Sequence, residues 1–267
     1  MSAGKQAIKP YLRKDIAMKV TKVKKTLSLI AIHTIAFVIA FLVCFIYKYN
    51  ASIGEKILYI VPPENSYNPI TENKKTTYQW VCNDSSWIWD LELPASLYNY
   101  SETRMHLRRT PHGLRFNFWG YVEDETDDQY IKLLANEFTT IAENNNMSET
   151  EKIYLAVTFV QSIDSKKDID SRNVNEYPRF PIQTLWDRQG DCEDKSTLLC
   201  SLLILMGYDS ILIRSDNHMA VGLAGTFEGN CFIHDDKKYY FIETTVQNKK
   251  IGELPDSFLN KSLCIVE

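Results

Sequence analysis

Residues 190–225 read GDCEDKSTLLCSLLILMGYDSILIRSDNHMAVGLAG. The apolar run that follows Cys192 predicts a helix buried on most sides, with Gly207 as its C-terminal stop. The shorter runs ILIR and HMAVGLA, separated by Ser, Asp and Asn, predict antiparallel strands. A cysteine at the start of a buried helix, followed by a histidine at the start of a strand, decides how the rest of the chain is interpreted.

Three residues in this part of the chain have the types needed for thiol catalysis: Cys192, His218 and Glu243. The N-terminus of a helix favours a thiolate, which needs an imidazole within reach and an acceptor that orients it. Glu243 lies in the strand-like run YYFIETT, where an unpaired buried carboxylate would be costly, so it needs His218 or a structural Lys or Arg. A lone Cys or His in such places is more often structural, and only the combination favours catalysis.

Upstream of this stretch, the pattern predicts two helices. In residues 129–144, Ile131, Leu134, Phe138 and Ile141 recur at helical spacing. Ser148 and Glu151 form a capping box that opens a second helix. Residues 164–185 read as a polar connector, in which Pro178 and Pro181 exclude regular helix. With the strands that follow, these helices predict an α+β fold.

Residues 76–122 are rich in Tyr and Trp, interrupted by Asn, Asp and Pro. Aromatic runs of this kind predict short strands. A packed β layer is favoured over a sugar-binding aromatic platform. Pro62, Pro63 and Pro69 give residues 48–75 the character of a stalk.

The charge is unevenly distributed along the chain. The whole chain carries −4 and residues 1–25 contribute +7, while 26–47 have no formal charge, so the remainder carries −11. Residues 26–47 are long and apolar enough for a transmembrane helix, and the basic residues before them predict a cytoplasmic N-terminus with residues 48–267 outside. A cleaved signal peptide and a buried globular helix fit less well. The acidic outer part argues against a nucleic-acid partner.

Glycosylation sequons and cysteines add weaker indications. Five Asn-x-Ser/Thr sequons are mild support for an exported domain. The six cysteines contain no CxxC pair, so a zinc ribbon is disfavoured, and disulfide pairing is left open. Cys231 and Cys264 lie in apolar strand-like runs and are expected to be buried thiols.

The combination EYPRFPIQTL, GDCED, GYD, HMAVG and YYFIETT resembles the transglutaminase-like superfamily, especially its membrane-anchored prokaryotic and archaeal members of the cysteine protease type. The resemblance covers the chain from about Tyr130 to the end, is looser over 76–122 and is absent from 1–75. It implies a papain-like α+β core in which Cys192 attacks an amide carbonyl, His218 is its base and Glu243 orients His218. Many relatives carry Asp in place of Glu243.

The resemblance also implies an acyl-enzyme on protein or peptide substrates, resolved by water or by an amine, with hydrolysis preferred. The backbone N–H of Cys192 is the expected oxyanion donor. Gln183 or Trp186 could add a second, or simply pack the loop. Tyr177 and Arg179 are candidate cleft residues. An inactive scaffold and a glycan-binding envelope protein are the rival functions.

The negative charges of Asp191, Glu193 and Asp194 should raise the pKa of Cys192. The acidic run either caps the helix and holds the connector or binds calcium, as in related calcium-dependent proteases. No cofactor is otherwise required. The expected organisation is a basic cytoplasmic tail at 1–25, a transmembrane helix at 26–47, a stalk at 48–75, an aromatic β-rich segment at 76–125 and a transglutaminase-like catalytic domain at 126–267.

Overall fold

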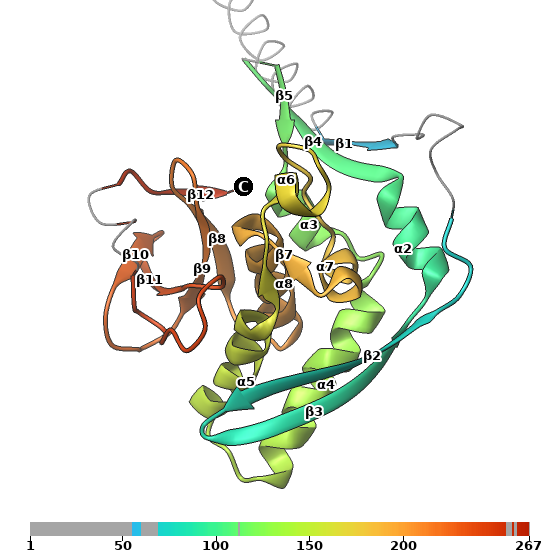
Figure 1. The fold of residues 1–267 in the computed structure, drawn as a ribbon. Helices are drawn as coiled ribbons and strands as arrows, with labels where there is room; N and C mark the ends of the chain where they lie inside the picture. The colour runs from blue at the N-terminus through green and yellow to red at the C-terminus, as the bar shows by residue number, and fades with distance from the viewer. Residues whose placement is uncertain (1–54, 60–68, 112, 255–257, 259–260, 267) are drawn as a thin grey trace, which may run out of the picture. The chain divides into compact units, whose positions relative to one another are not determined.

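Helix α8, Cys192–Leu205, lies at the centre of the structure, and its position in the chain confirms the sequence prediction. The computed structural model describes residues 55–59, 69–111, 113–254, 258 and 261–266. Figure 1 shows α8 between an antiparallel sheet on one side and helices α4, Asp128–Asn144, and α5, Glu149–Ser162, on the other. Gly207, with a φ of 90°, takes the left-handed conformation that ends the helix.

The sheet beside α8 has five strands in the order β10-β11-β9-β8-β12, all paired antiparallel. Their bounds are Ser210–Arg214 for β8, Met219–Ala224 for β9, Cys231–His234 for β10, Lys237–Ile242 for β11 and Cys264–Val266 for β12. In the central pair, Val221 of β9 lies opposite Ile242 of β11. The first residues of β9 therefore lie beside the last residues of β11, at the same end of these two inner strands.

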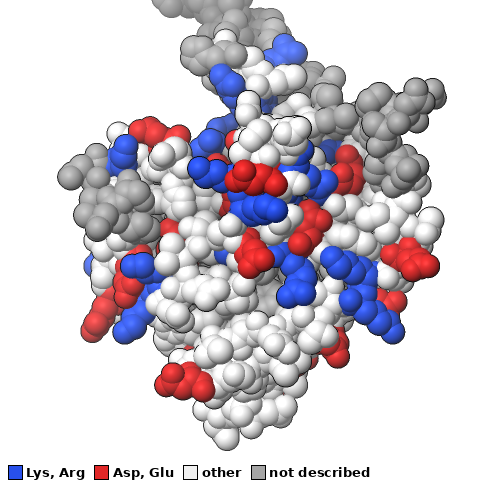
Figure 2. Space-filling view, viewed as in Figure 1, with Lys and Arg blue, Asp and Glu red and all other residues white. Residues whose placement is uncertain are grey.

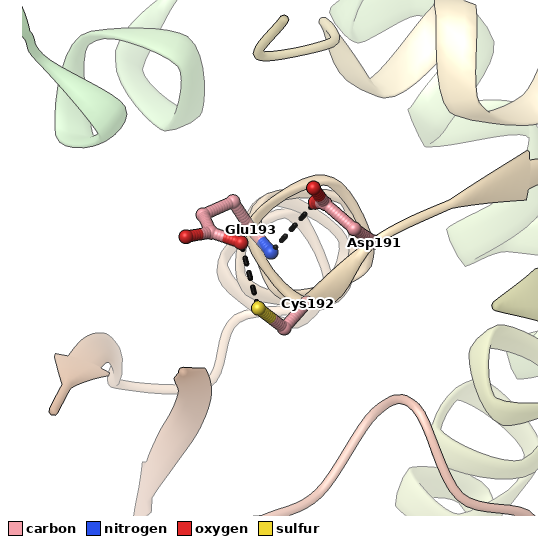
Figure 3. A group of neighbouring side chains, drawn as sticks. All are labelled: Asp191, Cys192 and Glu193. Atoms are coloured by element: carbon pink, nitrogen blue, oxygen red, sulfur yellow. Dashed lines mark hydrogen bonds between the residues drawn. The ribbon is translucent and has the colours of Figure 1, made fainter. Parts of the chain in front are cut away.

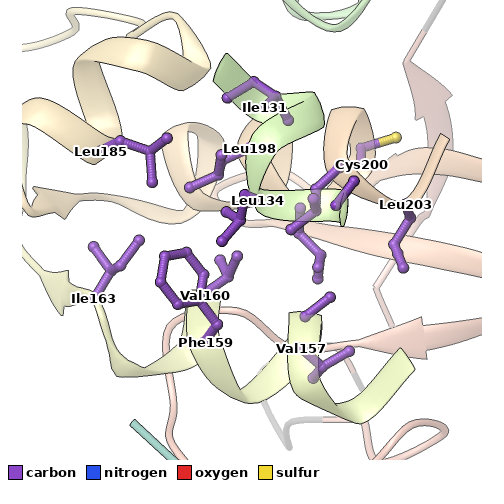
Figure 4. Packing of buried hydrophobic residues seen from close by; sticks show 14 of the residues in the cluster. Ile131, Leu134, Val157, Phe159, Val160, Ile163, Leu185, Leu198, Cys200 and Leu203 are labelled. Atoms are coloured by element: carbon purple, nitrogen blue, oxygen red, sulfur yellow. The ribbon is translucent and has the colours of Figure 1, made fainter. Parts of the chain in front are cut away.

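Helices α4 and α5 begin and pack as predicted. The Ser148 side chain accepts the N–H of Glu151, whose carboxylate accepts the N–H of Ser148, and this completes the predicted capping box. Figure 4 shows side chains of α4, α5 and α8 facing one another in a single core. The predicted stripe of α4 is buried there: Ile131, Leu134, Phe138 and Ile141.

The aromatic region before α4 forms a packed layer. Strands β2, Lys74–Cys82, and β3, Ser85–Leu93, make a hairpin, and β4, Arg104–Thr110, pairs with β1, Glu55–Tyr59, and β5, Gly113–Phe116. The rings of Tyr78 and Trp80 contact Phe159 of α5, and Trp80 is 3% exposed. These two rings serve the core and offer no open platform for a sugar.

The sequence prediction missed several helices. Two of them, α2, Ala95–Glu102, and α3, Phe118–Glu123, lie among the strands of 76–122. The connector holds α6, Asp168–Ser171, and α7, Pro181–Asp187. Pro181 begins α7 because the first helical position needs no N–H donor and suits the fixed φ of proline. The connector also contributes β6, Asp164–Ser165, which pairs in parallel with β7, Gln189–Gly190.

The predicted fold class, which included a transmembrane helix, is corrected by the structure. The described residues form an α+β fold, and no helix among them combines the length and hydropathy needed to cross a bilayer. The segment predicted to do so, 26–47, lies outside the described residues. The predicted cytoplasmic tail and most of the predicted stalk lie outside them too, while residues 55–59 of the stalk form β1. The predicted location of the domain stays a prediction.

The cysteines differ from expectation in their exposure. Cys231 is half-buried and Cys264 is exposed, because each lies in an outer strand of the sheet. All five cysteines of the described part, Cys82, Cys192, Cys200, Cys231 and Cys264, are free thiols. Cys264 is thus an exposed thiol in the same chain as the half-buried Cys192.

Candidate active site

Cys192 is the first residue of α8, and Asp191 caps the helix. One Asp191 carboxylate oxygen accepts the N–H groups of Glu193 at 3.1 Å and Asp194 at 3.3 Å. Asp194 in turn accepts the N–H of Asp191 at 3.3 Å. These bonds satisfy the first amides of the helix, but within the described residues the N–H of Cys192 has no acceptor. That N–H can stabilise an oxyanion beside the thiol.

His218 and Glu243 form a hydrogen-bonded pair at the end of the sheet where β9 begins and β11 stops. His218 Nε2 lies 2.7 Å from Glu243 Oε2. Glu243 is 1% exposed, and its Oε1 accepts both the N–H and the hydroxyl of Thr245 at 2.6 Å. Burial opposes ionisation of Glu243, but the bonds from His218 and Thr245 outweigh it and lower the pKa of this carboxyl. The carboxylate is therefore held ionised against the imidazole.

The Cys192 thiol lies next to the residue that follows His218. The backbone of Met219 lies close enough to the Cys192 sulfur to favour its thiolate form. In the described part of the chain, however, no hydrogen bond joins Cys192 to His218. Since His218 engages Glu243 through Nε2, its Nδ1 is the nitrogen left to act on the thiol.

The thiol instead contacts Glu193, the next residue in the chain. Cys192 Sγ donates to Glu193 Oε2 at 2.6 Å, as the dashed line in Figure 3 shows. Burial, followed by the charge of Glu193 and this hydrogen bond, raises the pKa of Cys192 well above that of an ordinary thiol. The tension predicted from the acidic run is thus present, and its main charged source is Glu193. In this arrangement Cys192 is a protonated thiol.

Glu176, which the sequence prediction overlooked, lies close enough to Glu193 for their charges to interact. Partial burial and then the charge of Glu193 raise the pKa of Glu176 to about 7, although the residue as a whole is exposed. No motif singles out Glu176, since it stands in a polar connector. Only the folded chain reveals that the Glu176 carboxylate lies near that of Glu193.

Four connector residues are predicted as oxyanion or cleft residues: Tyr177, Arg179, Gln183 and Trp186. The structure places the first three in one polar hydrogen-bonded network, while the buried Trp186 ring packs on Tyr98. The Arg179 guanidinium, 1% exposed, lies 2.7 Å from Asp168 and 2.5 Å from Asp194. Gln183 donates to Glu102 and to the Tyr177 hydroxyl. None of the four forms a hydrogen bond with Cys192 within the described residues. Arg179 holds the connector against Asp194 of α8, while Tyr177 and Gln183 hold it against Glu102 of α2.

A second arginine extends this network toward α2. Arg172 forms ion pairs with Glu102 at 2.9 Å and with Asp187 at 2.8 Å. Figure 2 shows acidic and basic side chains adjoining one another across the upper middle of this face, in the region where Figure 1 draws α6 and α7. Of the acidic residues at the start of α8, Asp194 is paired with Arg179, whereas Asp191 and Glu193 form no ion pair within the described part of the chain.

The residues proposed to bind calcium do not fit that ion well. Asp191, Glu193 and Asp194 are the predicted ligands. Ligand atoms lie within 4.8 Å of one another in two overlapping groups, Asp191 with Cys192 and Glu193, and Asp191 with Asp168 and Asp194. The Asp194 carboxylate already accepts hydrogen bonds from Arg179, and the Asp191 carboxylate accepts those of the first amides of α8. Calcium requires about six to eight oxygen ligands, so it would have to displace a buried guanidinium. The structure favours the capping role over the metal role.

Lys195 and Ser165 are further residues near the site that the sequence prediction missed. Lys195 is fully buried three residues after Cys192. A charged residue inside a helix predicted to be buried on most sides was a usable signal, because a buried charge requires partners. Its partners come from a distant part of the chain and could not be named in advance.

No family model matches this chain, and no curated protein is significantly similar to it in sequence. Its function must therefore be argued from the arrangement of Cys192, His218 and Glu243.

Proposed function

We propose that this protein is a transglutaminase-like thiol enzyme that cleaves amide bonds of proteins or peptides, with Cys192 as nucleophile, His218 as general base and Glu243 as the residue that orients His218. The main support is the 2.7 Å contact between His218, just before β9, and Glu243, just after β11. This pair lies next to a cysteine at a helix N-terminus. Three separate elements thus supply a nucleophile, a base and an orienting acid.

The proposed reaction begins when the Cys192 thiol turns from Glu193 toward His218. Nδ1 of His218 takes the thiol proton as the sulfur attacks the carbonyl carbon, and the oxyanion forms near the Cys192 N–H. The C–N bond then breaks, and His218 returns the proton to the departing amine. Water, deprotonated by His218, hydrolyses the thioester, releases the acid and restores the thiol. An amine in place of water would give transfer, and hydrolysis is our preferred outcome.

Alkylation of the purified full chain by iodoacetamide across pH tests the proposal. Peptide mapping gives separate rates for Cys192 and for the exposed Cys264, which serves as an internal reference. Burial and the Glu193 contact raise the pKa of Cys192, and transfer of its proton to His218 should reverse this effect. We therefore expect Cys192 to react well below the ordinary thiol pKa of about 8.5 and to lose this reactivity in His218→Ala. Equal pH dependence for Cys192 and Cys264 in the wild type would contradict the proposal.

A non-catalytic scaffold is the second candidate, and the Cys192–Glu193 contact favours it. A thiol that donates to a carboxylate, and whose pKa is raised by burial, is a poor nucleophile. If the wild-type chain alkylates at Cys192 only at high pH, and His218→Ala changes nothing, the scaffold becomes the better assignment.

A further inference from the structure

Lys195 is a buried cation on the helix that carries Cys192. It is 0% exposed, and its ammonium donates to Ile163 O at 2.6 Å, Ser165 Oγ at 3.1 Å and Gln161 O at 3.4 Å. All three acceptors are neutral, and no ion pair of the described chain includes this lysine. Burying an ammonium without a paired carboxylate is costly, so its retention here requires a physical reason.

Part of the reason lies at the end of α5. Gln161 and Ile163 stand where the helix ends, and the last carbonyls of a helix lack partners within it. They also carry the negative end of the helix dipole, which favours a cation. The Lys195 ammonium therefore joins α8 to the last turn of α5.

The contacts of Lys195 continue to the proposed catalytic acid by two routes. Ser165 Oγ, which accepts from Lys195, donates to Thr245 O at 2.8 Å, and Thr245 donates twice to the Glu243 carboxylate. Gln161, whose backbone carbonyl also accepts from Lys195, donates through its side chain to Glu243 O at 2.8 Å. One route thus fixes the carboxylate of Glu243 and the other fixes its backbone.

We propose that Lys195 is a positioning residue that couples the helix bearing Cys192 to the loop bearing Glu243 and so holds the Glu243 carboxylate toward His218. This inference rests on the proposed function. Electrostatics agree with the geometry: burial lowers the pKa of Lys195 to about 8, and the negative charge of Glu243 opposes that shift. A neutral residue at 195 would remove both the charge and the anchor of the Ser165 route.

Substitutions along the Ser165 route test this with less risk to folding, because Ser165 is exposed. Ser165→Ala cuts the link between Lys195 and Thr245, and Ser165→Thr restores a hydroxyl. Ser162→Ala is the matched control, since among the described residues the Ser162 hydroxyl bonds only to Phe159 O of its own helix. Lys195→Gln, checked for folding by near-UV circular dichroism, tests the lysine itself.

Two measurements on the full chain report the outcome. One is the rate of Cys192 alkylation at neutral pH. The other is the ring N–H resonance of His218 in the ¹⁵N-histidine-labelled protein, identified by its absence in His218→Ala. We expect Ser165→Ala to slow alkylation about 3- to 10-fold, the scale of one lost hydrogen bond, and to broaden the resonance. Lys195→Gln should do at least as much, while Ser165→Thr and Ser162→Ala should resemble the wild type.

The outcomes separate this inference from the proposed function. If Ser165→Ala and folded Lys195→Gln leave both the rate and the resonance unchanged, Lys195 has no positioning role. If wild-type Cys192 reacts as an ordinary thiol while the His218 resonance still depends on Lys195, the enzymatic function fails, but the coupling of Lys195 to the His218–Glu243 pair stands.

Discussion

The Cys192 thiol donates to the carboxylate of Glu193 at 2.6 Å, although His218 immediately precedes β9, the strand that packs against α8. This contact with the next residue of the chain holds the Cys192 sulfur in its protonated form. Any reaction at Cys192 must first break this contact. The residue after the nucleophile therefore sets how readily a thiolate forms.

Glu193→Gln should raise the reactivity of Cys192. The substitution removes the negative charge that, after burial, contributes most to the raised pKa of the thiol. Lowering a thiol pKa by one unit increases the thiolate fraction about 10-fold when the pH lies below the pKa, so we expect roughly that gain in alkylation rate at a pH below the midpoint of the wild-type Cys192 profile. Glu143→Gln, on the exposed side of α4, is the control. An unchanged rate would show that the Glu193 charge does not govern the thiol.

Asp127 should make stability depend on pH. Burial, opposed by the bond it accepts from the Ile182 N–H, raises the pKa of Asp127 to about 7. Between about pH 4 and 7 the folded state therefore binds more protons than the unfolded state, so the free energy of unfolding contributed by this group falls as pH rises. The loss amounts to at most about 4 kcal/mol.

Urea unfolding at several pH values, followed by circular dichroism, measures this effect. In Asp127→Asn the dependence over that window should be flatter than in the wild type, because the amide does not ionise. Asp128→Asn, at the next and less buried position, should retain the wild-type slope. Parallel curves for the wild type and Asp127→Asn would exclude a titrating Asp127.

Arg179→Met should destabilise the fold severely. The guanidinium is the partner of Asp168 and Asp194, and its removal leaves buried carboxylates without a cation. Loss of one member of a buried ion pair costs about 3–5 kcal/mol. Arg179→Lys keeps the charge but not the planar set of donors, so we expect an intermediate loss in chemical denaturation. A change below about 1 kcal/mol for Arg179→Met would mean that the network does not hold the connector.

Chelation of calcium should have no effect. Because Arg179 occupies Asp194 and the first amides of α8 occupy Asp191, EGTA and added Ca²⁺ should leave both the melting temperature and Cys192 alkylation unchanged. A ligand that binds the folded state raises its apparent stability. A clear rise in melting temperature with Ca²⁺ would therefore restore the metal interpretation.

Much of the local structure could be predicted from the sequence because short-range physics determines it. The stripe of α4, the Ser148–Glu151 capping box and the Gly207 stop depend only on residues within a few positions of one another. The same holds for the strands after α8. By contrast, the sequence pattern misses α7 because Pro181 indicates a break in a helix as readily as a first helical residue.

The sequence by itself determined which residue types stand at the start of α8, before β9 and after β11. Only the tertiary structure decided their relations: the pairing of β9 with β11 joins His218 to Glu243, and packing of the connector directs Arg179 to Asp194. Lys195 reaches partners at least 30 residues away in the chain. Contacts over such separations depend on how whole elements pack and on which buried charges find partners, and no local pattern encodes that.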